Sequence, residues 1–89
     1  MLPENDQERK AIRLSNQWRV FPKATVALAK HIQRGGDKYC NGVPEWDRSK
    51  SPEDLESMMR HCFELVNGKE DEYTLAAIAW RAMAILENH

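Results

Sequence analysis

Two stretches of the sequence, residues 55–66 and 75–86, repeat apolar side chains with the period of an α-helix. In the first stretch these side chains are Leu55, Met58, Met59, Cys62, Phe63 and Val66. In the second they are Leu75, Ile78, Ala79, Ala82, Met83 and Leu86. Asn67 and Gly68 stand between the two stretches, and such residues commonly end helices. The pattern predicts two consecutive helices that bury these faces.

A third helix is predicted upstream, from Pro22 to the Gly35-Gly36 pair. Proline suits a first helical turn, and a glycine pair can adopt the left-handed conformation that ends a helix. Residues 1–20 are mostly polar or charged, with few apolar anchors, and fit an arm or a short helix. Because no strand-like alternation occurs, we expect an all-α fold: a small helical bundle of residues 21–89 preceded by the arm of residues 1–20.

The last predicted helix is apolar on nearly every side. Its remaining faces carry Ala76, Ala77, Trp80 and Ile85. A helix of this kind is buried on more than one side, and a domain of three or four helices offers little to cover it. We therefore expect a homo-oligomer, a dimer or higher, formed through this Ala-rich C-terminal helix.

The overall composition excludes some classes of protein. The 89 residues contain no apolar run near the roughly 20 residues that span a bilayer, so no membrane association is expected. The N-terminus does not resemble a secretory signal, and Cys40 and Cys62 lack metal-type spacing. These features predict a cytoplasmic protein with free thiols.

Positive charge is concentrated in the first half of the chain. Residues 9–38 contain eight Lys or Arg and one acidic residue, and Lys23, Lys30 and Arg34 share one helical face with His31 beside them. Lys38 follows the glycine pair, where backbone amides could approach an anion. The run fits either a solvated helix face or an anion site.

Four further residues allow two interpretations each. Arg60 can pair with acidic residues one turn away on either side, and His61 can lie at the edge of the core, or one of the two can contact a ligand. Tyr39 and Trp46, in the predicted loop, can close the top of the core or stack on a base.

Acidic residues gather at two predicted helix starts. Glu53 and Glu56 lie one turn apart, and Glu70, Asp71 and Glu72 open the last helix. Carboxylates on facing helices hold divalent metals in helical bundles. The positive end of the helix dipole explains the same residues without a metal.

Four segments together resemble a known family. They are "FPKATVALAKHIQRGGDKY", "PEW", "LESMMRHCFELVNGKED" and "AAIAWRAMAILE", and their order and spacing over residues 21–87 are similar to those of the small phage-type dATP/dGTP diphosphohydrolase domains, relatives of the MazG-like all-α nucleotide pyrophosphohydrolases. The resemblance implies Mg²⁺-assisted attack of water on a nucleoside triphosphate, with several carboxylates around the metal.

The chain departs from this family pattern in its acidic residues. Residues 24–34 contain no Asp or Glu, although the resemblance implies carboxylates on this helix. Of the related MazG signature, ExxE followed by ExxD, Glu53 and Glu56 supply the first half and residues 67–75 do not supply the second. A basic helix face repels Mg²⁺ and attracts phosphate directly.

The leading hypothesis is therefore a non-catalytic, phage-encoded nucleotide-binding protein that sequesters a phosphate-bearing nucleotide, such as an immune signal, without a cofactor. Its expected ligand-binding residues are Lys30, His31, Arg34, Gly35, Gly36, Lys38, Tyr39, Trp46, Arg60 and His61.

Two alternatives stay open. The first is an active Mg²⁺-dependent dATP/dGTP pyrophosphohydrolase with Glu53, Glu56, Glu64 and Asp71 as catalytic residues, of which Glu53, Glu56 and Asp71 would hold the metal. The second is a small helical interaction protein whose basic half docks on an acidic partner. Nucleic acid is not the expected partner, although the formal net charge of -1 does not exclude it, because the positive charge gathers in the first half of the chain.

Overall fold

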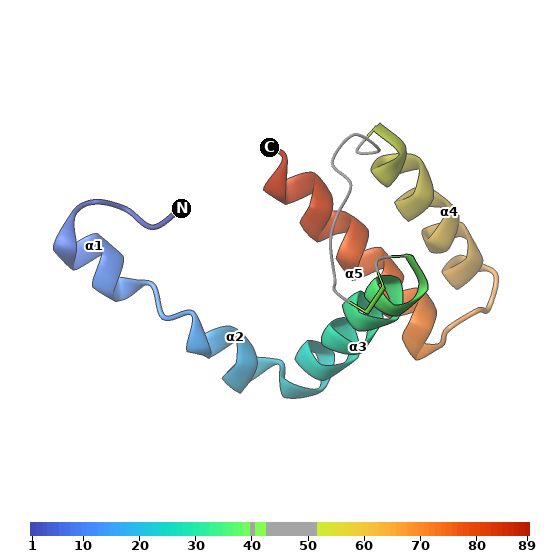
Figure 1. The fold of residues 1–89 in the computed structure, drawn as a ribbon, viewed down its shortest axis with the longest axis horizontal. Coiled ribbons are helices and arrows are strands. Elements are labelled where there is room, and N and C mark those ends of the chain that lie inside the picture. The colour runs from blue at the N-terminus through green and yellow to red at the C-terminus, as the bar shows by residue number, and fades with distance from the viewer. Residues whose placement is uncertain (40, 43–51) are drawn as a thin grey trace.

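The fold is all-helical, as the sequence predicted (Figure 1). The computed structural model describes residues 1–39, 41–42 and 52–89, leaving aside the side chain of Tyr39. Its helices are α1 (Asp6–Ala11), α2 (Ser15–Val20), α3 (Pro22–Tyr39), α4 (Asp54–Val66) and α5 (Glu72–Glu87). Across these described residues there is no strand, and no helix is long and apolar enough to cross a membrane.

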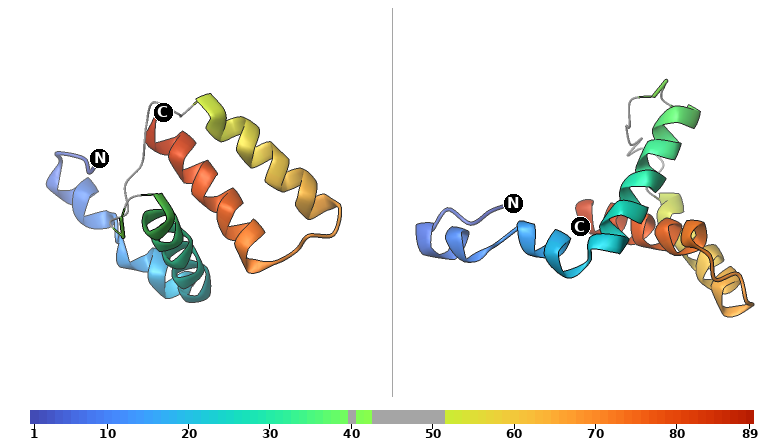
Figure 2. Two further views of the ribbon diagram at one scale, coloured as in Figure 1. Left: turned by 45° about the vertical axis from the view of Figure 1, so that its right-hand side comes forward. Right: turned by 90° about the horizontal axis from the view of Figure 1, so that it is seen from below.

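Helix α5 is the centre of the bundle. Helix α4 runs antiparallel beside it, and α3 crosses α5 steeply (Figure 2). Both neighbours pack on α5, so the expectation that this helix is covered on more than one side is confirmed within a single chain. Helices α1 and α2 form the arm that extends away from the bundle, and neither contains a buried residue.

The faces that α4 and α5 bury are not the ones predicted. The buried residues of α4 are Asp54 and Ser57, whereas Leu55, Met59, Phe63 and Val66 are exposed by 54 to 84%. The buried residues of α5 are Thr74, Ala76, Ala77 and Ala84, and its Leu75, Met83 and Leu86 are exposed. Small side chains let the two helices approach closely, so the fully buried contact forms on the alanine face. Met58, Cys62 and Ile78 of the predicted faces are half-buried, so the prediction is correct in part.

The predicted helix end at Gly35-Gly36 is wrong. Helix α3 continues through both glycines to Tyr39, and the left-handed conformations fall at Asn41 (φ 53°) and Gly42 (φ 87°). The Gly42 N–H donates to the Gly36 carbonyl at 3.0 Å, and the Gln33 side chain donates to the Gly42 carbonyl at 3.0 Å. The first bond satisfies one of the carbonyl groups that a helix end leaves open, and the second ties the following turn back to α3.

The other predicted helix ends are borne out where the structure describes them. Helix α4 ends at Val66, followed by Asn67 and a left-handed Gly68 (φ 98°). Helix α5 begins after Asp71, whose carboxylate accepts a hydrogen bond from the Thr74 N–H at 2.7 Å. This bond holds the pKa of Asp71 below its usual range. Cys40, predicted as a free thiol, lies outside the described residues, whereas Cys62 is a free thiol.

Substituting alanine for glycine should have opposite effects on stability at a helical position and at a left-handed position. Gly35→Ala should stabilise the protein by about 0.5–1 kcal/mol, because Gly35 is helical and an added Cβ meets nothing within 4 Å. Gly68→Ala should destabilise it by about 1 kcal/mol, because a left-handed backbone is strained for alanine. Urea unfolding followed by circular dichroism measures both, and a destabilising Gly35→Ala would contradict the continuous helix.

Candidate anion-binding site

A buried ion pair joins α4 to α5. Asp54, the first residue of α4, is 1% exposed, and its Oδ1 accepts a hydrogen bond from Arg81 Nη1 at 2.5 Å. The second oxygen of this carboxylate, Oδ2, has no hydrogen-bond partner. The Arg81 guanidinium also lies 4.7 Å from the centre of the Trp80 ring. Arg81 is thus held in place on two sides, while one buried carboxylate oxygen remains available.

Helix α3 brings a histidine and an arginine to the start of α5. The His31 ring meets Tyr73 edge-on at 5.2 Å, and the Arg34 guanidinium lies over the same ring at 5.3 Å. Burial lowers the pKa of His31, and the positive charges of Arg34, His61 and Arg81 lower it further. His31 is therefore near Arg34 of its own helix, His61 of α4 and Arg81 of α5.

Thr74 follows Tyr73 on α5, and His61 of α4 is near enough to His31 to affect its pKa. Helix α4 runs antiparallel to α5 with Asp54 against Arg81, so the later turns of α4 lie beside the earlier turns of α5 and His61 comes level with Thr74. Thr74 is fully buried, and its Oγ1 has no partner, nor has His31 Nδ1. Buried polar atoms without partners are uncommon, and they mark positions for water or a ligand.

We call this set of residues the polar junction. Its members are His31 and Arg34 of α3, Asp54 and His61 of α4, and Tyr73, Thr74 and Arg81 of α5. It contains two arginines and two histidines, and its buried carboxylate, Asp54, is paired with Arg81. Glu64 borders the junction, with its Oε2 3.7 Å from His61 Nδ1. The arrangement favours an anionic ligand over a cation.

The structure gathers some of the predicted ligand-binding residues and not others. Lys30 joins His31 and Arg34 on the same side of α3, with its Nζ 4.0 Å from Glu72 Oε1. His61 reaches the junction, but Arg60 is exposed on α4. Gly35 and Gly36 lie within a helix rather than a turn, and Lys38 is exposed in the last turn of α3. The side chain of Tyr39 and the whole of Trp46 lie outside the described residues.

The carboxylates expected for a metal site are dispersed. Glu53 and Glu56 are exposed at the start of α4, and Asp71 caps α5. Glu64 Oε2 lies 3.3 Å from Lys69 Nζ and 3.7 Å from His61 Nδ1, so it takes no part in the predicted pairing with Arg60. Within residues 1–39, 41–42 and 52–89, no group of three or more His, Cys, Asp or Glu is placed to hold a metal. The described residues of one chain do not fit a Mg²⁺ cluster.

Four members of the junction were missed by the sequence analysis: Asp54, Tyr73, Thr74 and Arg81. Arg81 was detectable, because it is the only charged residue between Glu72 and Glu87 in an otherwise apolar helix. Such a residue usually has a buried partner. Asp54 carries a weaker signal, since an acidic residue at a helix start is ordinary.

Comparison with known proteins assigns the family. A model of the family "dATP/dGTP diphosphohydrolase, N-terminal" matches residues 3–89. The chain therefore belongs to this family, and the match covers both the arm and the bundle. No curated protein and no solved structure matches the chain.

Replacing Arg81 should weaken the bundle strongly. Arg81→Met removes the partner of a carboxylate that is 1% exposed, and an uncompensated buried charge costs about 3 kcal/mol. The matched control is Arg60→Met, on an exposed and unpaired arginine of α4, which should change stability by less than about 0.5 kcal/mol. Thermal and urea unfolding of the three proteins compare these effects, and equal losses would contradict the central place of the ion pair.

Proposed function

We propose that this domain binds a purine deoxynucleotide through its phosphate groups, which contact the polar junction directly. The observation that carries the proposal is the convergence of His31, Arg34, His61 and Arg81 from three helices, while the described carboxylates stay apart. The family name, with dATP and dGTP in it, supports the purine deoxynucleotide as the ligand class.

The chemistry of the junction fits a phosphate group. An arginine guanidinium presents parallel N–H donors that match phosphate oxygens, and Arg34 is held over the Tyr73 ring without a carboxylate partner among the described residues. Thr74 Oγ1 is a buried hydroxyl available as a donor. Lys30 lies on the same side of α3, where Glu72 offsets its charge at 4.0 Å.

Capture without hydrolysis is the form of the proposal that we favour. Hydrolysis of a triphosphate in this family's manner calls for carboxylates around Mg²⁺, and one described chain does not gather them. The same hypothesis includes a phage origin for the protein and an immune-signal nucleotide as its ligand. Titration with a panel of nucleotides tests the identity of the ligand.

The second candidate is a Mg²⁺-dependent dATP/dGTP pyrophosphohydrolase, which the family name favours. It would draw its metal ligands from Glu53, Glu56 and Asp71 and use Glu64 as a further catalytic carboxylate. In this case the dispersed carboxylates must be completed by residues outside the described part of one chain. A protein that docks on an acidic partner is the third candidate.

Calorimetric titration with dATP, dGTP and cyclic or ADP-ribose-type nucleotides separates the candidates. We expect binding that persists in EDTA, weakens as salt rises, and returns the ligand intact on chromatography. Arg34→Gln should weaken binding at least about tenfold, because it removes a charged donor to phosphate. Arg60→Gln is the matched control and should leave affinity unchanged, since Arg60 is exposed outside the junction.

The other outcomes are equally informative. Recovery of a monophosphate and pyrophosphate only when Mg²⁺ is present would establish the enzyme and overturn capture. Failure of every nucleotide to bind a folded sample would favour the interaction protein. Equal losses of affinity in Arg34→Gln and Arg60→Gln would show that the nucleotide does not bind at the junction.

Nucleotide affinity should increase as the pH falls from 8 to 6. The pKa of His31 lies below its ordinary value of 6.5 in the free protein, and a bound phosphate would raise it by offsetting the neighbouring positive charges. Binding would then take up a proton at His31, so affinity is greater at lower pH. His31→Asn should flatten the dependence, whereas His89→Asn, at the exposed C-terminus, should not. Parallel slopes for both variants would contradict a role for His31.

The lowered pKa of His31 also predicts how the stability of the ligand-free protein depends on pH. Stability should fall at lower pH, whereas nucleotide affinity should rise. The unfolded chain binds a proton at His31 more readily than the folded chain does, so the contribution of His31 to stability falls as the pH drops below about 6.5. Unfolding free energy measured between pH 7.5 and 5.5, with His31→Asn as the reference, should show this loss. An unchanged difference between the two proteins would contradict the burial of His31.

A further inference from the structure

The two arginines of the polar junction are held by different kinds of partner. Arg81 is paired with the carboxylate of Asp54. Arg34 forms no ion pair with any residue that the structure describes, and its guanidinium lies over the Tyr73 ring, 5.3 Å from the ring centre. Because Arg34 belongs to α3 and Tyr73 to the first turn of α5, this contact joins two helices. Arg34 is therefore held by an uncharged partner.

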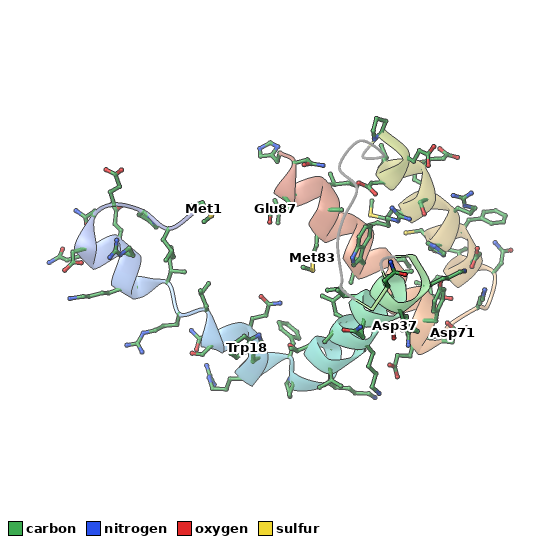
Figure 3. The ribbon with its side chains drawn as sticks, viewed as in Figure 1. Met1, Trp18, Asp37, Asp71, Met83 and Glu87 are labelled. Carbon is green, nitrogen blue, oxygen red and sulfur yellow. The ribbon has the colours of Figure 1, made fainter. Side chains whose placement is uncertain are left out.

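An acidic residue on the same helix is close to Arg34 in sequence. Asp37, in the last turns of α3, follows it by three positions, a spacing at which helical side chains can pair (Figure 3). The Asp37 carboxylate instead accepts a hydrogen bond from Gln33 Nε2 at 2.9 Å, and the same amide donates to the Gly42 carbonyl at 3.0 Å. The end of α3 thus gives Asp37 a neutral partner, and Arg34 reaches Tyr73.

The acidic residue next to Tyr73 does not pair with Arg34 either. Glu72 Oε1 lies 4.0 Å from the Nζ of Lys30, one turn before Arg34 on α3. A carboxylate partner would both orient an arginine and offset its charge. Within the described residues, Tyr73 provides the first effect without the second, so the charge of Arg34 is fixed in place and not neutralised.

An aromatic ring leaves the hydrogen-bond donors of an arginine available. The ring attracts the cation through its π-electrons and presents no oxygen acceptor on its face, so the guanidinium N–H groups can still bind phosphate oxygens. No ion pair has to be broken first. A long side chain that is already held also loses less conformational freedom when a ligand binds. The contact with Tyr73 therefore prepares Arg34 for an anion.

The same ring contacts the other polar group that α3 brings to the junction. His31 meets Tyr73 edge-on, with the ring centres 5.2 Å apart. The next residue on α5, Thr74, is fully buried and has a hydroxyl without a partner. Tyr73 itself is 51% exposed, so it lies between the solvent and these buried groups. One aromatic side chain thus contacts both residues of α3 that we expect to meet the phosphate.

We propose that Tyr73 is a positioning residue for the anion site, whose ring holds the Arg34 guanidinium so that a phosphate group meets a fixed and unpaired charge. This role rests on the nucleotide binding proposed above. It requires the aromatic ring of Tyr73 and not its hydroxyl, because the contact with Arg34 is made over the ring.

Calorimetric titration of the full chain with dGTP in EDTA tests this role. Tyr73→Leu removes the ring and should weaken binding by roughly three- to tenfold, because binding must then order Arg34. Tyr73→Phe keeps the ring and should recover most of this affinity. In the double variant of Arg34→Gln and Tyr73→Leu the two losses should not add, and its affinity should equal that of Arg34→Gln. Phe63→Leu, at a position of α4 that is 70% exposed, is the matched control and should have no effect.

NMR of the ligand-free protein separates this role from the proposed function. The Arg34 side-chain protons, assigned by their loss in Arg34→Gln, should show a ring-current shift in the wild type and Tyr73→Phe that disappears in Tyr73→Leu. If this shift is present but the folded wild type does not bind dGTP, the proposed function fails and the role in binding fails with it.

Three other results would overturn the positioning role alone. They are wild-type affinity in Tyr73→Leu when Arg34→Gln binds weakly, additive losses in the double variant, and absence of the ring-current shift from the wild type. Circular dichroism of each variant monitors folding. If Tyr73→Leu does not fold, the shift in the wild type and the affinity of Tyr73→Phe decide, because loss of binding on removal of the hydroxyl alone would also contradict a role for the ring.

Discussion

The Asp54–Arg81 ion pair fixes how this small bundle is put together. It joins the first turn of α4 to the later half of α5, and the short connection through Gly68 joins their other ends, so the two helices are held antiparallel at both ends. Between these points the contact consists of small residues such as Ala77 and Ser57. Because alanine packing alone buries little apolar area, the orientation of α4 depends on the charge pair more than on a conventional core.

The polar junction is a consequence of that orientation. With Asp54 placed against Arg81, His61 comes beside the start of α5, where α3 presents His31 and Arg34 to Tyr73. Three helices thus contribute arginine or histidine side chains to one region. Two carboxylates lie near these side chains: Asp54 is paired with Arg81, and Glu64 lies 3.7 Å from His61. The anion preference that we propose depends on this helix orientation, which also leaves Glu53 and Glu56 exposed at the start of α4.

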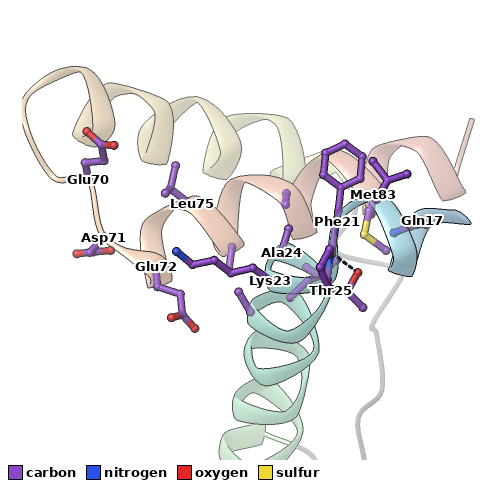
Figure 4. Close-up of a pocket in the computed structure, with 16 residues that line it drawn as sticks. Gln17, Phe21, Lys23, Ala24, Thr25, Glu70, Asp71, Glu72, Leu75 and Met83 are labelled. Carbon is purple, nitrogen blue, oxygen red and sulfur yellow. Dashed lines mark hydrogen bonds between the residues drawn. The ribbon is translucent and has the colours of Figure 1, made fainter.

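The apolar surface of the chain follows from the same cause. The helices meet through alanine faces, so Leu55, Met59, Phe63, Leu75, Met83 and Leu86 of the periodic pattern are exposed, whereas Met58, Cys62 and Ile78 are half-buried. Part of the exposed apolar surface, including Phe21, Leu75 and Met83, lines a hollow between α2, α3 and α5 (Figure 4). Family membership over residues 3–89 includes the arm, which agrees with a role for the arm in the folded unit.

Sequence alone determined the helical class, the ends of α4 at Asn67-Gly68, the weak structure of the arm and the family resemblance, because these depend on local periodicity, local backbone preferences and motif order. It also predicted the grouping of Lys30, His31 and Arg34, since their spacing places them on one side of a helix. It did not determine which face of α4 and α5 is buried, where α3 ends, or that Asp54 and Arg81 meet. Those outcomes depend on contacts between residues far apart in the chain, where close approach of small side chains and one charge pair outweigh the burial of larger apolar groups.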